Sequence, residues 1–130
     1  MPDFLFIDMS KTLFLSLFIC LSFQLCAQPQ LKFDDAKQNF GFVKKGKEVK
    51  LLYTFTNIGN QPLIIFDAGA ECSCTKVTYP KAPIQPGKSG TIEVNMDTSP
   101  AYGRQNRTVE VVSNDDKSPH KIRFKGVILN

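Results

Sequence analysis

Alternation of apolar and polar side chains along residues 48–57 constrains the fold more than any other feature of this chain. Val49, Leu51, Tyr53 and Phe55 fall on one face of this segment, and Lys50, Thr54 and Thr56 fall on the other. Successive side chains of a β-strand point to opposite faces of a sheet, so a period of two predicts a strand with one buried face. An amphipathic helix would instead place its apolar residues three and four positions apart.

Further short segments of this kind are separated by residues that favour turns, such as the Asn, Gly and Pro of 57–62. Strands are predicted at residues 31–34, 39–43, 48–57, 62–67, 75–79, 91–97, 108–113 and 121–128. Segment 62–67 is almost entirely apolar, which predicts a strand buried on both faces, ended by Gly69. The side chains expected to be buried together are Leu51, Tyr53, Phe55, Ile65, Ile92, Val94 and Phe124.

This pattern predicts an all-β fold, an immunoglobulin-like β-sandwich of seven to eight short antiparallel strands. It is not the antibody variety. The chain has no Trp to pack between the sheets, and the cysteines beyond residue 27, Cys72 and Cys74, lie too close in sequence to join two sheets.

Residues 1–27 are predicted to be a signal peptide. An apolar run at 13–23 is followed by Ala27, a small residue suited to the position before a cleavage site. The run is too short to span a bilayer comfortably. We therefore expect cleavage before Gln28 and no transmembrane anchor, with residues 28–130 forming one immunoglobulin-like domain in the periplasm or outside the cell.

Two details of this leader bear on its processing. Asp3 and Asp8 precede its single Lys, whereas signal peptides begin with basic residues, so a start at Met9 fits the pattern better. Lipid attachment requires small residues before the modified cysteine, and bulky residues precede both Cys20 and Cys26. No lipid anchor is therefore expected.

The cationic residues do not predict a nucleic-acid site. The formal net charge of the chain is +4, and charges of both signs are interspersed. The densest cationic group comprises Lys44, Lys45, Lys47 and Lys50. No aromatic residue lies between these lysines to stack on bases, so we interpret the group as the solvated face of a hairpin.

Cys72 and Cys74 are the chemically unusual residues of the domain, and three roles for them are open. A disulfide requires a turn, because Cα atoms two residues apart in a strand are about 6.6 Å apart, near the upper limit for such a bond. The reduced thiolates would suit a soft ion such as Cu(I), although the other candidate ligands, His120 and Met96, are distant in sequence. The pair could also be structural, as a bridge or as buried thiols.

Several motifs follow one another along residues 31–130. They include Phe40-Gly41-Phe42-Val43, Asn57-Ile58-Gly59-Asn60-Gln61-Pro62, Cys72-Ser73-Cys74-Thr75, Pro86-Gly87-Lys88 and Gly126-Val127. In these motifs the chain resembles the bacterial secreted domain of unknown function 1573, itself similar to major-sperm-protein-like and cilia-associated immunoglobulin-like domains. Ser73 departs from the Gly that commonly lies between the family's two cysteines. The resemblance implies the fold and export, but no activity.

No catalytic constellation is visible: the acidic residues are scattered in turns, and there is no Ser-His-Asp set or phosphate-binding glycine loop. We therefore expect a non-enzymatic protein without a cofactor. The predicted function is an exported immunoglobulin-like module for protein binding or envelope structure, whose partner is another envelope or secreted protein. The alternative is a thiol-redox or Cu(I)-handling domain that uses Cys72 and Cys74.

Overall fold

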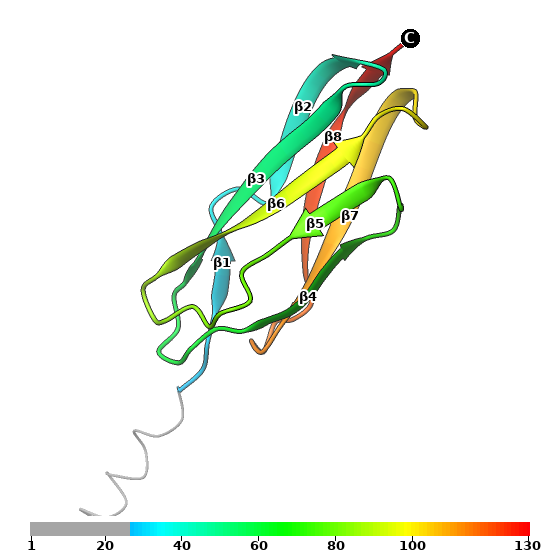
Figure 1. The fold of residues 1–130 in the computed structure, drawn as a ribbon. Helices are drawn as coiled ribbons and strands as arrows, with labels where there is room; N and C mark the ends of the chain where they lie inside the picture. The colour runs from blue at the N-terminus through cyan, green and yellow to red at the C-terminus, as the bar shows by residue number, and fades with distance from the viewer. Residues whose placement is uncertain (1–26) are drawn as a thin grey trace, which may run out of the picture.

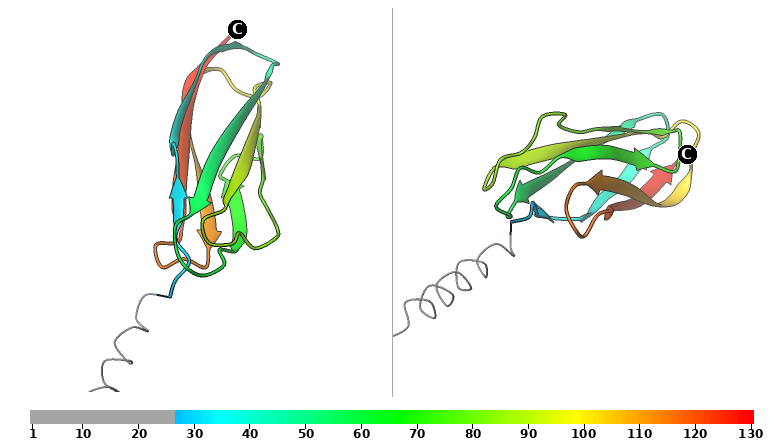
Figure 2. Two further views of the ribbon diagram at one scale, coloured as in Figure 1. Left: turned by 90° about the vertical axis from the view of Figure 1, so that its left-hand side faces the viewer. Right: turned by 90° about the horizontal axis from the view of Figure 1, so that it is seen from below.

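The computed structural model describes residues 27–130; residues 1–26 of the predicted leader lie outside the described part. The described residues form eight strands in two four-stranded sheets that pack face to face (Figure 1). Figure 2 shows these two layers from the side and from one end. Between residues 27 and 130, no helix has the length and apolarity needed to cross a membrane. The predicted all-β immunoglobulin-like sandwich is confirmed.

Sheet A has the strand order β1–β3–β6–β5. Its long central strands, β3 (Glu48–Asn57) and β6 (Ser89–Asp97), run antiparallel, with Leu51 opposite Val94 and Tyr53 opposite Ile92. The edge strands β1 (Leu31–Phe33) and β5 (Thr75–Thr78) are short. Short edges leave few unpaired backbone groups for association with other chains.

Sheet B has the order β2–β8–β7–β4. Its strands are β2 (Lys37–Lys44), β8 (His120–Leu129), β7 (Gly103–Ser113) and β4 (Ile65–Ala70). The β2–β8 pairing is parallel, which differs from the antiparallel pattern predicted, whereas β7 pairs antiparallel with both β8 and β4. The reason is that the chain passes from sheet A to sheet B between β1 and β2 without reversing its direction, as Figure 1 shows.

The core lies between the two sheets and agrees with the predicted facing of the strands. Six of the seven side chains predicted to be buried together are buried, and Leu51 is partly buried against them. Tyr53 is fully buried, and its hydroxyl donates a hydrogen bond to the Arg123 carbonyl of the opposite sheet at 2.8 Å. Burial, and to a smaller extent the charge of Asp35, raises the pKa of Tyr53, which keeps this donor protonated.

The predicted strand at 62–67 is placed and oriented differently in the structure. The strand begins at Ile65 and continues to Ala70, so Gly69 does not end it. Leu63 forms only an isolated bridge with Ile84. Because the sandwich has only two layers, the outer face of each sheet meets solvent, and Phe66 is 59% exposed. The prediction of burial on both faces was therefore wrong.

Asn57, at the end of β3, joins three segments that are distant in sequence. Its side chain is fully buried and donates hydrogen bonds to the carbonyls of Gln61 and Ile84, at 2.7 and 2.9 Å. Its amide oxygen accepts hydrogen bonds from the backbone N–H groups of Gln30 and Gly59. Both ends of the amide are thus satisfied, as a buried polar group requires.

Asp115 plays a similar part in the connection between β7 and β8. Its side chain is fully buried and accepts hydrogen bonds from the N–H groups of Leu31 and Lys117, at 2.9 and 2.7 Å. His120 Nε2 lies 3.0 Å from Asp115 Oδ2, which makes an ion pair when the imidazole is protonated. This carboxylate therefore fastens the start of β1 to the β7–β8 connection.

Candidate functional site

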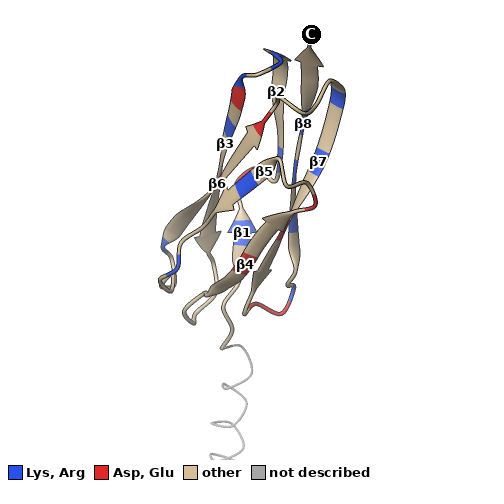
Figure 3. Ribbon diagram, turned by 45° about the vertical axis from the view of Figure 1, so that its right-hand side comes forward, with Lys and Arg blue, Asp and Glu red and all other residues tan. Residues whose placement is uncertain are grey.

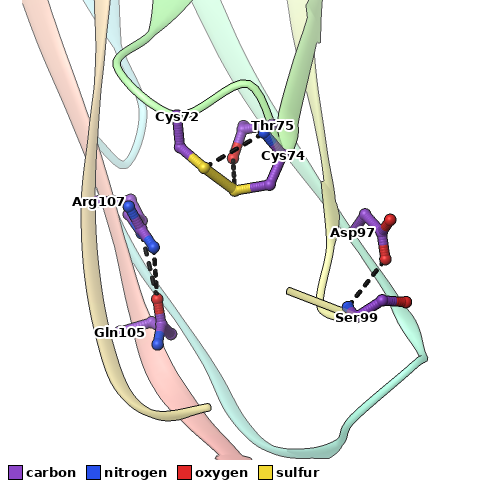
Figure 4. Close-up of a disulfide and its surroundings, with 7 residues drawn as sticks. All are labelled: Cys72, Cys74, Thr75, Asp97, Ser99, Gln105 and Arg107. Atoms are coloured by element: carbon purple, nitrogen blue, oxygen red, sulfur yellow. Dashed lines mark hydrogen bonds between the residues drawn. A yellow bond between two sulfur atoms is a disulfide. The ribbon is translucent and has the colours of Figure 1, made fainter. Parts of the chain in front are cut away.

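The cysteine pair lies in the turn between β4 and β5 (Figure 4). The Thr75 N–H donates to the Cys72 carbonyl at 3.1 Å, and this turn brings the Cα atoms of Cys72 and Cys74 to 5.2 Å, with the sulfurs at disulfide distance. Between residues 27 and 130 no residue other than glycine has a positive φ. Ser73 therefore stands at the family's glycine position without backbone strain.

The cysteine pair lies at the edge of the hydrophobic core. Both cysteines are half-buried, and Cys74 packs against the core cluster, while its carbonyl accepts a hydrogen bond from the Asp97 N–H at 2.9 Å. Figure 4 also shows Arg107 and Gln105 on β7, where Arg107 Nη2 donates to Gln105 Oε1 at 2.8 Å. The guanidinium group is thus held by an amide rather than by a cysteine.

The other candidate metal ligands have different contacts. Met96 is fully buried in the core. His120 lies against Asp115 and makes an edge contact with Phe33, with ring centroids 6.3 Å apart. No group of three or more His, Cys, Asp or Glu side chains within residues 27–130 is arranged to hold a metal ion.

Simultaneous replacement of Cys72 and Cys74 by Ser is expected to lower the free energy of unfolding by no more than about 1–2 kcal/mol, because the ring that they close is very short and removes little entropy from the unfolded chain. Urea denaturation of the variant and of the parent, with and without reductant, measures this difference. Loss of cooperative unfolding in the variant would show instead that the pair is an essential structural link.

On the outer face of sheet A, charges of opposite sign lie close together. Lys50 Nζ lies 3.2 Å from Glu93 Oε2, and Asn95 donates to Glu93 Oε1 at 2.7 Å. The hydrogen bond from Asn95, followed by the contact with Lys50, lowers the pKa of Glu93. A hydrogen bond from the Ser99 N–H lowers the pKa of Asp97, at the end of β6. Both carboxylates are therefore charged at neutral pH, beside the exposed Lys76 of β5.

The outer face of sheet B is different, because four of its exposed cations, Lys37, Arg104, Arg123 and Lys125, take part in no recorded ion pair within residues 27–130. Strand pairing places nine residues in three rows across β2, β8 and β7, which we call the basic patch. The rows are Lys37, Arg123 and Thr108; Asn39, Lys125 and Asn106; and Phe42, Val127 and Arg104. Figure 3 shows basic segments on β7 and β8. Among residues 27–130 the recorded ion pairs are Lys50–Glu93 and Asp115–His120, so none of the four cations of the patch is paired.

Two shallow hollows lie side by side on the basic patch. One, of about 390 Å³, is lined in part by Phe42, Arg104 and Gly126, and the other, of about 330 Å³, in part by Lys37 and Arg123. They share three lining residues, Asn39, Asn106 and Lys125, and no acidic residue lines either hollow.

The sequence contains part of the signal for this patch. Lys121, Arg123 and Lys125 alternate with buried residues on the last strand and so share one face of it. Lys121 lies outside the patch, opposite Glu110. The residues that β2 and β7 contribute to the patch depend on which strands are neighbours and on the register of their pairing. Local sequence patterns specify neither. The lysine-rich group at 44–50 did not indicate the patch, because its members are divided between the sheets: Lys44 ends β2 of sheet B, whereas Lys50 pairs with Glu93 on sheet A.

The family described as "Protein of unknown function (DUF1573)" matches residues 31–128, nearly all of the part that the structure describes. The chain belongs to this family. The resemblance carried by the sequence motifs is thereby confirmed. None of the curated proteins matches this DUF1573 chain.

Solved structures share the fold at low sequence identity. A protein of unknown function from Porphyromonas gingivalis W83 has a TM-score of 0.69 and 17% identity, over 78% of this chain and 48% of that one. This chain therefore spans about half the length of that protein. PapD-like domain 7 of human CEP192 has a TM-score of 0.62 and 6% identity, over 81% and 87%. The VesB protease of Vibrio cholerae has a TM-score of 0.58 and 17% identity, over 78% and 32%.

Proposed function

We propose that this chain is an exported, non-enzymatic binding module of the cell envelope, and that it binds its partner through the outer face of sheet B. The observation that carries the proposal is the basic patch, where Lys37, Arg104, Arg123 and Lys125 lie exposed with no carboxylate partner among residues 27–130. Unpaired charge of one sign attracts a partner of the opposite sign and raises its rate of encounter.

The rest of the described surface supports this choice of face. The lysine on the central strands of sheet A, Lys50, already pairs with Glu93, so that face offers less net charge to a partner. The cysteine pair offers less to a redox or Cu(I) function than to structure, because its neighbour Arg107 bonds to Gln105 and His120 contacts Asp115. Binding through the outer face of sheet B also does not require a reactive cysteine pair in the turn between β4 and β5.

Reversal of two charges in the patch, Arg123→Glu with Lys125→Glu, is expected to abolish sedimentation of the purified protein with envelope fragments from cells that produce it. Binding of the parent protein is expected to weaken from about 0.05 to about 0.5 M NaCl, because salt screens exposed charges. The matched control is Lys32→Glu with Lys76→Glu, which makes the same change in net charge on exposed strand residues of sheet A. Equal loss of binding in both double variants, or none in either, would contradict the proposal.

A further inference from the structure

We propose that the partner of the basic patch is an acidic polysaccharide, a chain of sugar units that carry carboxylate groups. This inference rests on the proposed function, since it names the partner of the same face. Three properties of the patch point to this chemistry: its unpaired cations, its amide-lined hollows and its exposed aromatic ring.

The cations select a polyanion. Arg123 and Lys125 are two residues apart on β8, a spacing of about 6.8 Å along an antiparallel strand, and Lys37 and Arg104 flank them on the neighbouring strands. Guanidinium groups bind carboxylates through two parallel hydrogen bonds, and lysine contributes a mobile point charge. Several anionic groups at successive positions of a polymer can therefore be bound at once.

The amides and the hollows favour sugars over an acidic protein. Asn39 and Asn106 flank Lys125 on either side, and an amide group both donates and accepts hydrogen bonds, as sugar hydroxyls require. The Oδ1 of Asn39 accepts from the Gly41 N–H at 2.9 Å, which fixes the orientation of its NH₂ group. The volumes of the two hollows fall at the lower end of the range for small-molecule sites, about 300–1,000 Å³. Because they adjoin, they fit successive units of one chain.

Phe42 supplies an apolar surface beside these polar groups. Its side chain is 76% exposed, although such a ring is normally buried, and it lies in the row that ends with Arg104. The C–H face of a sugar ring can stack on an aromatic ring while its hydroxyl and carboxylate groups bond at the rim. Phe42 is therefore expected to distinguish a sugar polymer from other polyanions.

The edge strand β2 is poorly suited to pair with an added strand from a protein partner. The register of β2 shifts between Asn39 and Gly41, and Gly41 has a φ of 73°. Such a bulge, together with the lysines at both ends of β2, blunts a sheet edge against pairing with another strand. In addition, interfaces between proteins are depleted of lysine relative to the rest of the surface.

Titration calorimetry of the purified protein with three polymers tests the inference: polygalacturonate, poly-L-glutamate at equal carboxylate concentration, and neutral dextran. Polygalacturonate is expected to bind at least about tenfold more tightly than poly-L-glutamate, because only the sugar polymer satisfies the amides and the ring. Dextran is expected not to bind. Equal affinity for the two acidic polymers would overturn the inference and indicate a dock for acidic protein segments.

Variants separate the contributions. Phe42→Ala and Asn106→Ala are expected to weaken polygalacturonate binding about tenfold each and to leave poly-L-glutamate binding unchanged, whereas Lys125→Ala weakens both. Lys76→Ala, on sheet A, is the control and should change neither. If polygalacturonate does not bind but sedimentation with envelope fragments still depends on Arg123 and Lys125, only the polysaccharide inference is overturned. If sedimentation does not depend on these two residues, the proposed function is overturned.

Discussion

Replacement of Phe55 by Ala is expected to lower the free energy of unfolding by about 3–5 kcal/mol. The side chain is fully buried and makes an edge contact with Phe33, with ring centroids 6.0 Å apart. Across the β3–β6 pair its ring lies over Gly90, where an added Cβ would come within 2.6 Å of Phe55 Cζ. The cavity left by the ring cannot be refilled from Gly90, because glycine has no side chain to move.

Denaturation by urea, monitored by circular dichroism, measures this loss of stability. Phe42→Ala is the matched control, since it removes the same ring from a site that is 76% exposed, and we expect it to change stability by less than about 0.5 kcal/mol. A Phe55→Ala protein that unfolds at the same urea concentration as the parent would contradict the predicted burial of this face of β3.

Replacement of Asp115 by Ala is expected to cost about 2–4 kcal/mol at neutral pH, because it leaves the buried N–H group of Leu31 and the partly buried N–H group of Lys117 without their acceptor. Burial alone would raise the pKa of Asp115. The hydrogen bond from Leu31, the contact with His120 and the hydrogen bond from Lys117 outweigh burial and lower the pKa below its ordinary 3.8. The carboxylate is therefore bound more strongly in its charged form.

The sign of the pH dependence follows from this shift. The unfolded chain takes up the proton at a higher pH than the folded chain, so the stabilisation is complete well above pH 3.8 and is lost as the pH falls through the folded pKa. The difference between the parent and Asp115→Ala should therefore narrow on acidification below pH 3.8, which denaturation at several pH values measures. Asp116→Ala, on the exposed neighbour, is the control. A difference in the free energy of unfolding that stays constant through this pH range would contradict the lowered pKa of Asp115.

Local patterns predicted the strands because burial on one face of a sheet imposes a period of two. Val49, Tyr53 and Phe55 are buried as the alternation required, and Ile92 and Val94 are buried beside them on the neighbouring strand β6. The segment at 62–67 failed for a related reason. A continuous apolar run suggests burial on both faces, but in a sandwich of two sheets the outer face of every strand meets solvent, and Phe66 of β4 is exposed.

The interactions between distant segments were not available from such patterns. Asn57 looked like an ordinary turn residue, but its buried amide joins the N-terminal segment to two loops. The basic patch likewise depends on the parallel alignment of Asn39 with Lys125 and the antiparallel alignment of Lys125 with Asn106. The Cys72–Cys74 turn was anticipated only as a condition for a disulfide, since the backbone bend arises from the Thr75–Cys72 hydrogen bond.

The position of β8 has a consequence for the biogenesis of the domain. The last strand of the domain, β8, lies in the interior of sheet B, where it is the partner of both β2 and β7. Until residues 120–129 leave the ribosome, β2 has no neighbour in its sheet and the core lacks Ile122 and Phe124. Sequential folding from the N-terminus therefore cannot complete this sandwich before β8 has been synthesised, and the domain remains open until then. A domain with this strand order therefore remains an open chain, narrow enough to thread through a channel, until its own last strand is available.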